Sequence, residues 1–268
     1  MEKYGEILMV CECNQNCYYC LGKQMNKLQN VLNTSSQLHF SLWKNFDSYI
    51  AMLRSNKINL IYISSTIGEP LIYTHIDELF EYLSHLGFTV GLRTNGLLVN
   101  EHFDSIVKLN GEISVSINSL NKSSNYAICK SNKLFDYKQV LPKFISNNKK
   151  IRLAIVVNSF NKLEIFNMIR LLAEYKEAIQ YIQLRRIYNY YETVNNEDTD
   201  AFDYIMSMIN KYTKIGSYYE SDIYDVFGLS VSIWQDIFDK ESIQSFNYFT
   251  DGVYTNDALL VRGYEERI

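Results

Sequence analysis

Apolar residues along the chain gather into short runs that alternate with longer amphipathic stretches. Six of these runs predict buried β-strands, at residues 7–10, 59–64, 88–92, 112–117, 151–157 and 181–187. The run at 151–157 is apolar at nearly every position, which is typical of a parallel strand covered on both faces. Strands that alternate with helical stretches predict a parallel α/β arrangement, closed into a barrel or a partial barrel.

The first long stretch between strands has the signals of an amphipathic helix. Its apolar residues fall on one helical face; they are Ile76, Leu79, Phe80, Leu83 and Leu86. Thr74 is followed three residues later by an acid, as in a capping box, and Gly87 predicts the end of the helix. Residues 136–146 predict another helix, which either begins near Leu141 or is kinked at Pro142.

The pattern changes beyond about residue 195. Residues 202–212 predict one more amphipathic helix, and residues 227–233 alternate between apolar and small residues, as a strand does. The dipeptide Asp251-Gly252 predicts a hairpin between residues 245–249 and 253–255. The last third of the chain therefore predicts a helix with a small antiparallel layer.

The expected fold is α/β, a partial (β/α)6 barrel of the TIM type with a small C-terminal helix and antiparallel β layer. Residues 1–195 would form the barrel, and residues 196–268 would pack on it as a helix and hairpin layer. In such barrels the chemistry lies at the carboxyl ends of the strands. The residues that directly follow each strand are therefore the candidates for function.

Composition narrows the function classes. The chain has 268 residues, 47% hydrophobic and 21% charged, which allows an ordinary packed core. No run approaches the ~20 apolar residues of a membrane helix, and the first ten residues lack the marks of a signal peptide. We therefore expect a cytoplasmic protein without a membrane partner. The net charge of −4 gives no basic footprint, so a nucleic-acid partner is not expected.

The cysteines are concentrated near the N-terminus. Four of the five lie between Cys11 and Cys20, and Cys129 is remote. In a cytosolic chain such a group indicates a metal site or catalysis rather than disulfides. Cys129 follows the fourth predicted strand; it is a candidate hydrogen-atom donor or covalent site, with a packed or surface thiol as the alternative.

Cys13, Cys17 and Cys20 can converge on one inorganic cluster because three and two residues separate them. Iron–sulfur clusters are normally held by four cysteines, so three leave one iron open. The amino and carboxylate groups of S-adenosylmethionine (SAM) can chelate such an iron. A four-thiolate zinc site that includes Cys11 is the alternative, although its usual form is two cysteine pairs with a longer loop between them.

This segment and two later ones resemble the radical SAM superfamily. The family motif is Cys-x3-Cys-x2-Cys with an aromatic residue before the third cysteine, and Tyr19 fills that position. Gly68-Glu69-Pro70 resembles the family's Gly-Gly-Glu-Pro segment, with Ile67 in place of the first glycine. Thr94-Asn95-Gly96 resembles the Thr-Asn-Gly of members related to the molybdenum-cofactor and peptide-modifying branches.

The resemblance implies a [4Fe-4S] cluster on Cys13, Cys17 and Cys20, and SAM bound beside it. The implied SAM-binding residues all lie in the cysteine segment or at later strand ends: Tyr19, Gly68, Glu69, Asn95, Ser116, Asn118 and Arg185. In the family the aromatic residue packs near adenine, the Gly-Glu turn receives the amino group, and the fourth strand end holds ribose and carboxylate. The end of the sixth strand contacts adenine or substrate. An ordinary turn or strand-end role is the alternative for each.

The implied activity is reductive cleavage of SAM to a 5′-deoxyadenosyl radical, which abstracts hydrogen from a nucleotide-like small molecule or a short peptide. A reducing partner such as flavodoxin or ferredoxin would supply the electron. No cysteine follows Cys129, so this chain has no ligands for further clusters. The alternative function is a zinc- or cluster-stabilised binding module without catalysis. An iron–sulfur redox sensor would need an output domain or a basic DNA-binding face, and the sequence indicates neither.

Overall fold

The computed structural model describes residues 2–9, 11–20, 37–65, 68–187, 196–218, 221–234, 243–250 and 252–255. Its strands are β1 (Glu2–Met9), β2 (Leu60–Ser65), β3 (Thr89–Thr94), β4 (Ile113–Ser116), β5 (Ile151–Val156), β6 (Ile179–Arg185), β7 (Thr213–Tyr218), β8 (Ser221–Val226), β9 (Leu229–Trp234), β10 (Ile243–Phe249) and β11 (Tyr254–Thr255). Its helices are α3 (Phe46–Ser55), α4 (Ile76–His85), α5 (Phe103–Ile106), α6 (Lys122–Cys129), α7 (Tyr137–Ser146), α8 (Ile165–Leu172) and α9 (Asn196–Ile209), with 3-10 turns η1 (Phe40–Leu42), η2 (Pro70–Ile72) and η3 (Ala173–Ala178). Within these residues, none of the helices combines the length and the apolar character that crossing a bilayer requires.

All strands join one 11-stranded sheet in the order β11-β10-β1-β2-β3-β4-β5-β6-β9-β8-β7. The strands from β10 to β9 pair in parallel, and antiparallel pairs occur only at the two outer edges of the described sheet. The expected α/β fold, a parallel partial barrel with C-terminal antiparallel strands, is confirmed.

The position of the C-terminal strands was not foreseen. β10 pairs in parallel with β1, and β9 pairs in parallel with β6, so both extend the barrel sheet itself. Alternation of apolar and small residues identifies a strand with one buried face, but it does not name the partner strand. The division of the chain at residue 195 stays a prediction, because the sheet continues across it.

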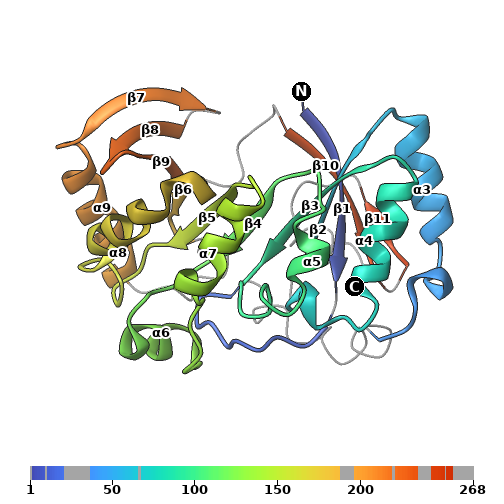
Figure 1. The fold of residues 1–268 in the computed structure, drawn as a ribbon, viewed down its shortest axis with the longest axis horizontal. Helices are drawn as coiled ribbons and strands as arrows, with labels where there is room; N and C mark the ends of the chain where they lie inside the picture. The colour runs from blue at the N-terminus through green and yellow to red at the C-terminus, as the bar shows by residue number, and fades with distance from the viewer. Residues whose placement is uncertain are drawn as a thin grey trace.

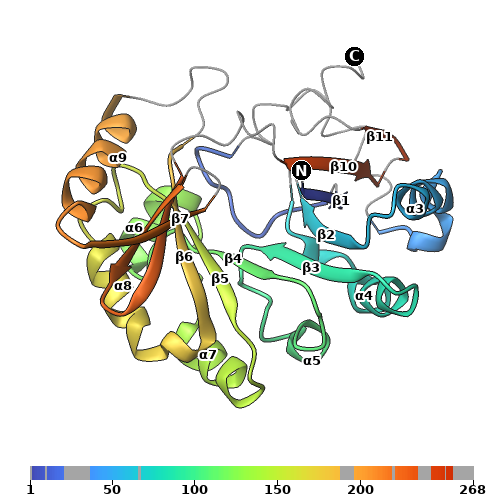
Figure 2. The same ribbon diagram turned by 90° about the horizontal axis from the view of Figure 1, so that it is seen from above.

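The sheet curves, and its two faces differ in chemistry. Figure 2 shows α3, α4, α5, α7 and α8 on the outer side of the curve. Outward side chains of the strands belong to the apolar core beneath these helices: Ile7, Ile61, Ile63, Val90, Leu92, Val115, Leu153, Ile155, Ile182 and Leu184. The alternate positions carry Glu6, Arg93, Arg152, Gln183 and Arg185, on the inner face.

Local signals set some of the helix ends. Gly87 follows α4 with a φ of 86°, a conformation that suits glycine at a helix C-terminus. The expected capping box is wrong: His75 occupies the N-cap of α4, and the hydroxyl of Thr74 donates to Oε1 of Gln37 at 2.6 Å. Of the two alternatives for the helix predicted at residues 136–146, a start near Leu141 is wrong. That helix, α7, begins five residues before Pro142, where the Asp136 side chain accepts a hydrogen bond from the backbone N–H of Gln139.

Two hairpins close the antiparallel edges. Val226 pairs with Leu229, and the two residues between them, Phe227 and Gly228, have φ values of 56° and 79°. Positive φ at both central residues matches the type I′ turn that suits a twisted hairpin. The predicted C-terminal hairpin is confirmed by the antiparallel pairing of β10 with β11.

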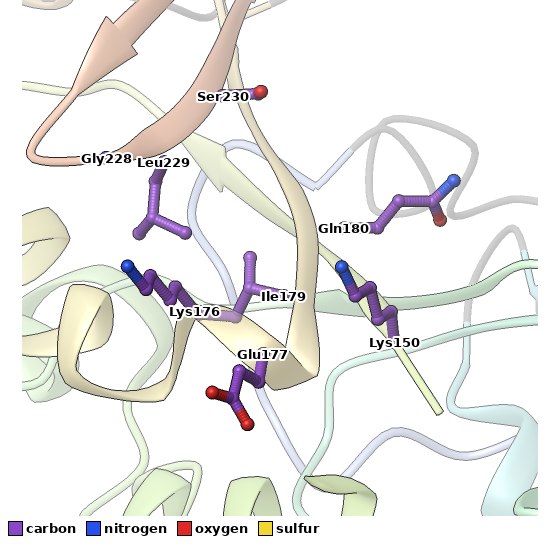
Figure 3. A pocket seen from close by; sticks show the side chains of 8 residues that line it. All are labelled: Lys150, Lys176, Glu177, Ile179, Gln180, Gly228, Leu229 and Ser230. Carbon is purple, nitrogen blue, oxygen red and sulfur yellow. The ribbon is translucent and has the colours of Figure 1, made fainter. Parts of the chain in front are cut away.

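A pocket of about 310 Å³ lies between η3 and the beginnings of β6 and β9 (Figure 3). Lys150, Lys176 and Glu177 contribute its charged lining groups. These residues precede or open their strands, so the pocket lies at the amino ends of the parallel sheet. The cysteines follow the carboxyl end of β1, at the opposite edge, and the pocket is therefore separate from the candidate site.

Candidate functional site

The cysteine segment, residues 11–20, leaves the end of β1 and runs past the carboxyl ends of the strands toward α6 (Figure 1). Backbone hydrogen bonds fix its beginning and its middle. The N–H of Glu69 donates to the carbonyl of Glu12 at 3.0 Å, and the N–H of Asn16 donates to the carbonyl of Cys129 at 2.7 Å. A segment without regular secondary structure is thus held against the turn after β2 and the end of α6.

Cys13, Cys17 and Cys20 lie near one another but too far apart to hold a single ion. The charges of Cys13 and Cys20 each help to raise the pKa of Cys17, so the three thiols interact. Among the described residues, no three cysteine thiols lie all within 4.8 Å of one another. Ligands of one tetrahedral zinc would do so, because a Zn–S bond is only about 2.3 Å long. A four-iron cluster spreads its thiolates wider than one zinc ion does, and cysteine thiolates are the ligands that such clusters take.

Protein atoms surround the thiols in this position, although part of Cys13 still reaches the surface. Burial raises the pKa of the Cys13 thiol to about 11. A hydrogen bond with Cys129, and then burial, raise the pKa of the Cys17 thiol. Metal binding needs deprotonated thiols, so iron held by these side chains would supply the positive charge that stabilises their thiolate forms.

Two asparagines at neighbouring strand ends contact the cysteine segment. Asn95 follows β3, and its Nδ2 lies 3.8 Å from Sγ of Cys13 and donates to Oδ1 of Asn14 at 2.6 Å. Asn118 follows β4, and its Nδ2 lies 3.8 Å from Sγ of Cys17. Each asparagine thus directs amide N–H groups at one of the predicted cluster ligands. Both were candidates from the sequence, although for contact with SAM rather than with the cysteines.

Tyr19 and Asn118, two of the candidates from the sequence, lie in contact. The hydroxyl of Tyr19 donates to Oδ1 of Asn118, and burial raises the pKa of Tyr19 well above its ordinary value. The backbone of Asn118 is fixed in turn, because Nδ2 of the buried Asn161 donates to the Asn118 carbonyl at 2.9 Å. The aromatic residue before the third cysteine is therefore fixed to the end of β4.

Glu69 is the centre of a buried hydrogen-bond network at the ends of β2 and β3. Its side chain is only 1% exposed. Oε1 accepts from the Thr94 hydroxyl at 2.5 Å and from the N–H of Leu71 at 3.1 Å, and Oε2 accepts from the N–H of Asn95 at 2.7 Å. Burial raises the pKa of Glu69. The carboxylate holds the Thr-Asn-Gly turn in place, and its contact with the SAM amino group stays a prediction.

Gly68 packs directly against Cys11. A Cβ at Gly68 would lie 2.3 Å from the Cys11 carbonyl oxygen and 2.6 Å from its Sγ, so only glycine fits. The Cys11 thiol donates to the Glu69 carbonyl at 3.2 Å, and burial raises its pKa to about 12. Cys11 is therefore the small buried residue expected from the sequence, and it joins the cysteine segment to the Gly-Glu turn.

Cys129 is not remote in space. It is the last residue of α6, it is fully buried, and its thiol lies against that of Cys17. The Cys129 thiol donates to the Asn125 carbonyl at 3.1 Å. Of the two earlier interpretations, the packed thiol agrees with this burial, and a catalytic role stays a prediction.

Ser116 and Arg185 lie apart from the cysteine contacts. Ser116 ends β4 with an exposed side chain, and within the described part of the chain no hydrogen bond joins it to the cysteine segment. Arg185 ends β6, and its charged neighbours are Arg152 and Arg93 on the inner face of the sheet. The structure thus brings five of the seven SAM-binding candidates together at the cysteines and leaves these two further away.

Sequence reasoning missed the residues that support the site. Asn14 and Gln15 occupy variable positions of the cysteine motif, yet Asn14 bonds to Asn95 and Gln15 bonds to Asn118. Asn161 lies five residues after β5 and carries no motif. The available signal was position: each lies in the cysteine segment or just beyond a strand end, where functional side chains gather in barrels.

Comparison with known proteins gives a family and several relatives. A family model described as the radical SAM superfamily matches residues 7–172, which is more than half of the 268 residues. GTP 3′,8-cyclase of Clostridium perfringens (strain 13 / Type A) is 24% identical over 198 residues, which cover 69% of this chain and 58% of that protein. The matched family region contains every site residue named above except Arg185.

Solved structures show the same fold. SuiB of Streptococcus suis bound to S-adenosylmethionine gives a TM-score of 0.67 at 13% identity, over 96% of this chain and 60% of that one. The structure of anSMEcpe with bound AdoMet gives 0.52 at 15% identity, over 79% of this chain and 60% of that one. The chain thus spans about 60% of the length of these relatives.

Proposed function

Because the chain belongs to the radical SAM superfamily, we propose that it is a radical SAM enzyme acting on a nucleotide-like small molecule or a short peptide. The family implies a [4Fe-4S] cluster and SAM as cofactors. Once both are bound and the cluster is reduced, they supply a 5′-deoxyadenosyl radical able to abstract hydrogen from an unreactive carbon. The protein's own part is to bind, orient and exclude water.

The observation that carries the proposal is the arrangement of three thiols. Cys13, Cys17 and Cys20 interact with one another, but they are not packed as closely as the ligands of a single zinc ion. Three ligands leave a fourth position open on a cubic cluster, and that is where SAM would bind. A purely structural metal site has no need for an open position.

The surrounding residues have defined tasks in this proposal. Asn95 and Asn118 place amide donors beside Cys13 and Cys17, which favours the charged form of a thiolate. Glu69 fixes the turns after β2 and β3 through three hydrogen bonds, and Gly68 allows the cysteine segment to pack against that turn. Tyr19, held by Asn118, offers an aromatic surface beside the third cysteine for adenine.

Two relatives support the two proposed substrate classes, a nucleotide-like small molecule and a short peptide, and neither relative decides between them. One relative is named for action on GTP, and SuiB has been solved bound to its precursor peptide SuiA. We propose a flavodoxin or ferredoxin as the electron donor, because Cys13 is exposed and an electron can enter the site from outside. We propose a cytoplasmic location, where such donors occur.

The test is anaerobic reconstitution with iron and sulfide, followed by dithionite and SAM. Wild-type protein should bind about four irons and release 5′-deoxyadenosine, as a [4Fe-4S] cluster with an open iron requires. Cys17→Ser should lose both. Cys11→Ser is the matched control: the serine hydroxyl can still donate to the Glu69 carbonyl, and Cys11 is not one of the three predicted ligands, so the variant should keep iron and activity. A wild-type protein that binds one zinc, takes up no iron and leaves SAM intact would favour the binding-module alternative.

A further inference from the structure

On the inner face of the sheet, positively charged side chains outnumber the negatively charged ones. Glu6 on β1 pairs with Arg93 on β3 at 2.6 Å. Glu112, just before β4, pairs with Arg152 on β5 at 3.3 Å. Arg185 on β6 is a third guanidinium on this face, and no ion pair joins it to any described residue. These five side chains therefore leave one positive charge without an acidic partner.

Arg185 and its neighbour on the same face have unused hydrogen-bonding atoms. Nε of Arg185 is buried and makes no hydrogen bond. Gln183, two residues earlier on β6, is 2% exposed, and its buried Oε1 also makes none. Buried polar atoms are hydrogen-bonded in the great majority of cases, and a buried charge without a partner is strongly destabilising. Such a pair on one strand face is the signature of a site that is completed by a ligand.

The environment of Arg185 favours an anion. Burial, and then the charge of Arg152, lower the pKa of Arg185 to about 10. The other groups with the strongest effect on this pKa are the hydroxyl-bearing Tyr181 and Tyr4 and the paired Arg93, and no carboxylate is among them. A carboxylate or phosphate oxygen placed here would neutralise the surplus charge and accept the unused N–H.

We propose that Arg185 and Gln183 form a subsite that binds the anionic group of a small-molecule substrate. That group is a phosphate or a carboxylate, and a hydroxyl or amino group of the same substrate lies next to it. Nε of Arg185 donates to the anion, and Oε1 of Gln183 accepts from the neighbouring hydroxyl or amine. This inference rests on the proposed function and narrows its substrate class. It favours the small molecule over the peptide, because both atoms are buried beneath the strand ends.

The SAM carboxylate is the other possible anion, and location separates the two. The groups that act on Arg185 include Tyr4 and Arg152, which lie near the amino ends of β1 and β5. Met9 lies five positions beyond Tyr4 on β1, a rise of about 17 Å in a strand. Arg185 itself ends β6, so the subsite reaches from that strand end toward the interior of the barrel, where a substrate beyond SAM would lie.

Isothermal titration of the full chain tests the proposal with two probes, inorganic pyrophosphate and malonate. Wild type should bind at least one of them, and the stronger probe names phosphate or carboxylate as the group. Arg185→Gln should weaken that binding about tenfold or more, as expected for a charge-assisted hydrogen bond. Arg186→Gln is the matched control, because Arg186 is an adjacent arginine that faces Asp203 at 3.8 Å instead. It should change the affinity less than twofold.

Two further readouts exclude a merely structural role. Arg185→Gln should raise the thermal midpoint, because it removes an unpaired buried charge. Gln183→Leu keeps the charge and should weaken a hydroxylated probe, tartrate, more than it weakens malonate. If Arg185→Gln binds the probes as wild type does, or if wild type binds neither, the subsite is wrong.

SAM titration of the cluster-loaded protein separates the two anion sources. Equal SAM affinity in Arg185→Gln and wild type assigns the subsite to substrate. A loss of SAM affinity with unchanged probe binding overturns the proposal and assigns Arg185 to the cofactor. Probe binding is also measured before reconstitution. Arg185-dependent binding in a protein that never cleaves SAM would sink the proposed function and leave the subsite standing.

Discussion

The outer and inner faces of the central sheet are made by alternate residues of the same strands, yet they have opposite chemistry. On β6 the outward Leu184 is fully buried in the core, while its neighbours Gln183 and Arg185 bring an amide and a guanidinium to the inner face. A shift of one residue in strand register would exchange the two sets. The outer face therefore fixes the register by burial, and the register places the polar groups of the inner face.

The largest effect on stability should come from the outer face. Ile155→Ala removes a fully buried side chain from the core between β5 and its helices. We expect the free energy of unfolding to fall by about 2–5 kcal/mol, because apolar contacts are lost and a cavity remains. Urea unfolding measures the change. The folded variant should bind pyrophosphate and malonate as wild type does, and weakened binding would break the separation between the two faces.

A smaller effect on stability should come from the carboxyl edge of the sheet, where core packing and the position of the cysteine segment depend on the same residues. Gly68→Ala places a methyl group within 2.3 Å of the Cys11 carbonyl oxygen, so the cysteine segment must move. The expected loss is about 1–3 kcal/mol, together with reduced iron uptake on reconstitution. Gly216→Ala is the control, since a Cβ there meets no atom within 4 Å. Iron uptake equal in Gly68→Ala and wild type would contradict this packing role.

Glu69→Gln should also lower stability by about 1–3 kcal/mol at neutral pH, because an amide group cannot accept all three hydrogen bonds. The wild-type carboxyl has a raised pKa in the folded state. Its proton is therefore bound more tightly in the folded than in the unfolded protein, where the pKa is 4.5. The stability that this proton linkage adds is fully present below pH 4.5 and is lost as the pH rises through the folded value.

Unfolding of wild type and Glu69→Gln at several pH values between 4.5 and neutral measures this contribution. Wild type should gain stability relative to Glu69→Gln as the pH falls, so the difference between the two proteins should widen. The other carboxyl groups are the same in both proteins, so their effects cancel in the comparison. A difference that narrows at low pH would show that Glu69 is not the buried, raised-pKa carboxyl described above.

The smallest effect on stability should come from a single hydrogen bond on the inner face. Tyr181→Phe removes a hydroxyl that donates to Oε2 of Glu112 at 3.1 Å. The Arg152–Glu112 pair remains, so we expect a loss of about 0.5–1.5 kcal/mol in urea unfolding. A loss as large as that of Ile155→Ala would mean that the inner face also carries the stability of the fold.

The sequence predicted the strands well where one face is apolar and poorly where polar residues are buried. Its first strand was expected at 7–10, but β1 begins at Glu2, because Glu6 is buried against Arg93, a partner 87 residues away. β7 and β8 were missed for a related reason, since β7 is exposed throughout and shows no apolar alternation. Periodicity detects burial, and it cannot detect pairing between polar groups.

The candidate site likewise has features that the sequence predicted and features that it did not. The three cysteines, Gly68, Glu69 and the Thr-Asn-Gly turn were visible as motifs and lie together in the structure. The approach of Cys129 to Cys17 was not visible, because it depends on how α6 folds back across the carboxyl edge. The unused atoms of Gln183 and Arg185 were equally hidden, since a sequence does not show which polar atoms find partners.

The central claim is that Cys13, Cys17 and Cys20 hold a four-iron cluster with one open iron for SAM. Electron paramagnetic resonance of the reconstituted, dithionite-reduced protein tests it most directly, with spectra taken before and after addition of SAM. The account predicts a reduced [4Fe-4S] signal whose g values shift when SAM binds, and no such signal in Cys17→Ser. A reduced cluster whose spectrum does not change with saturating SAM, or a protein that holds zinc and gives no iron signal, would contradict it.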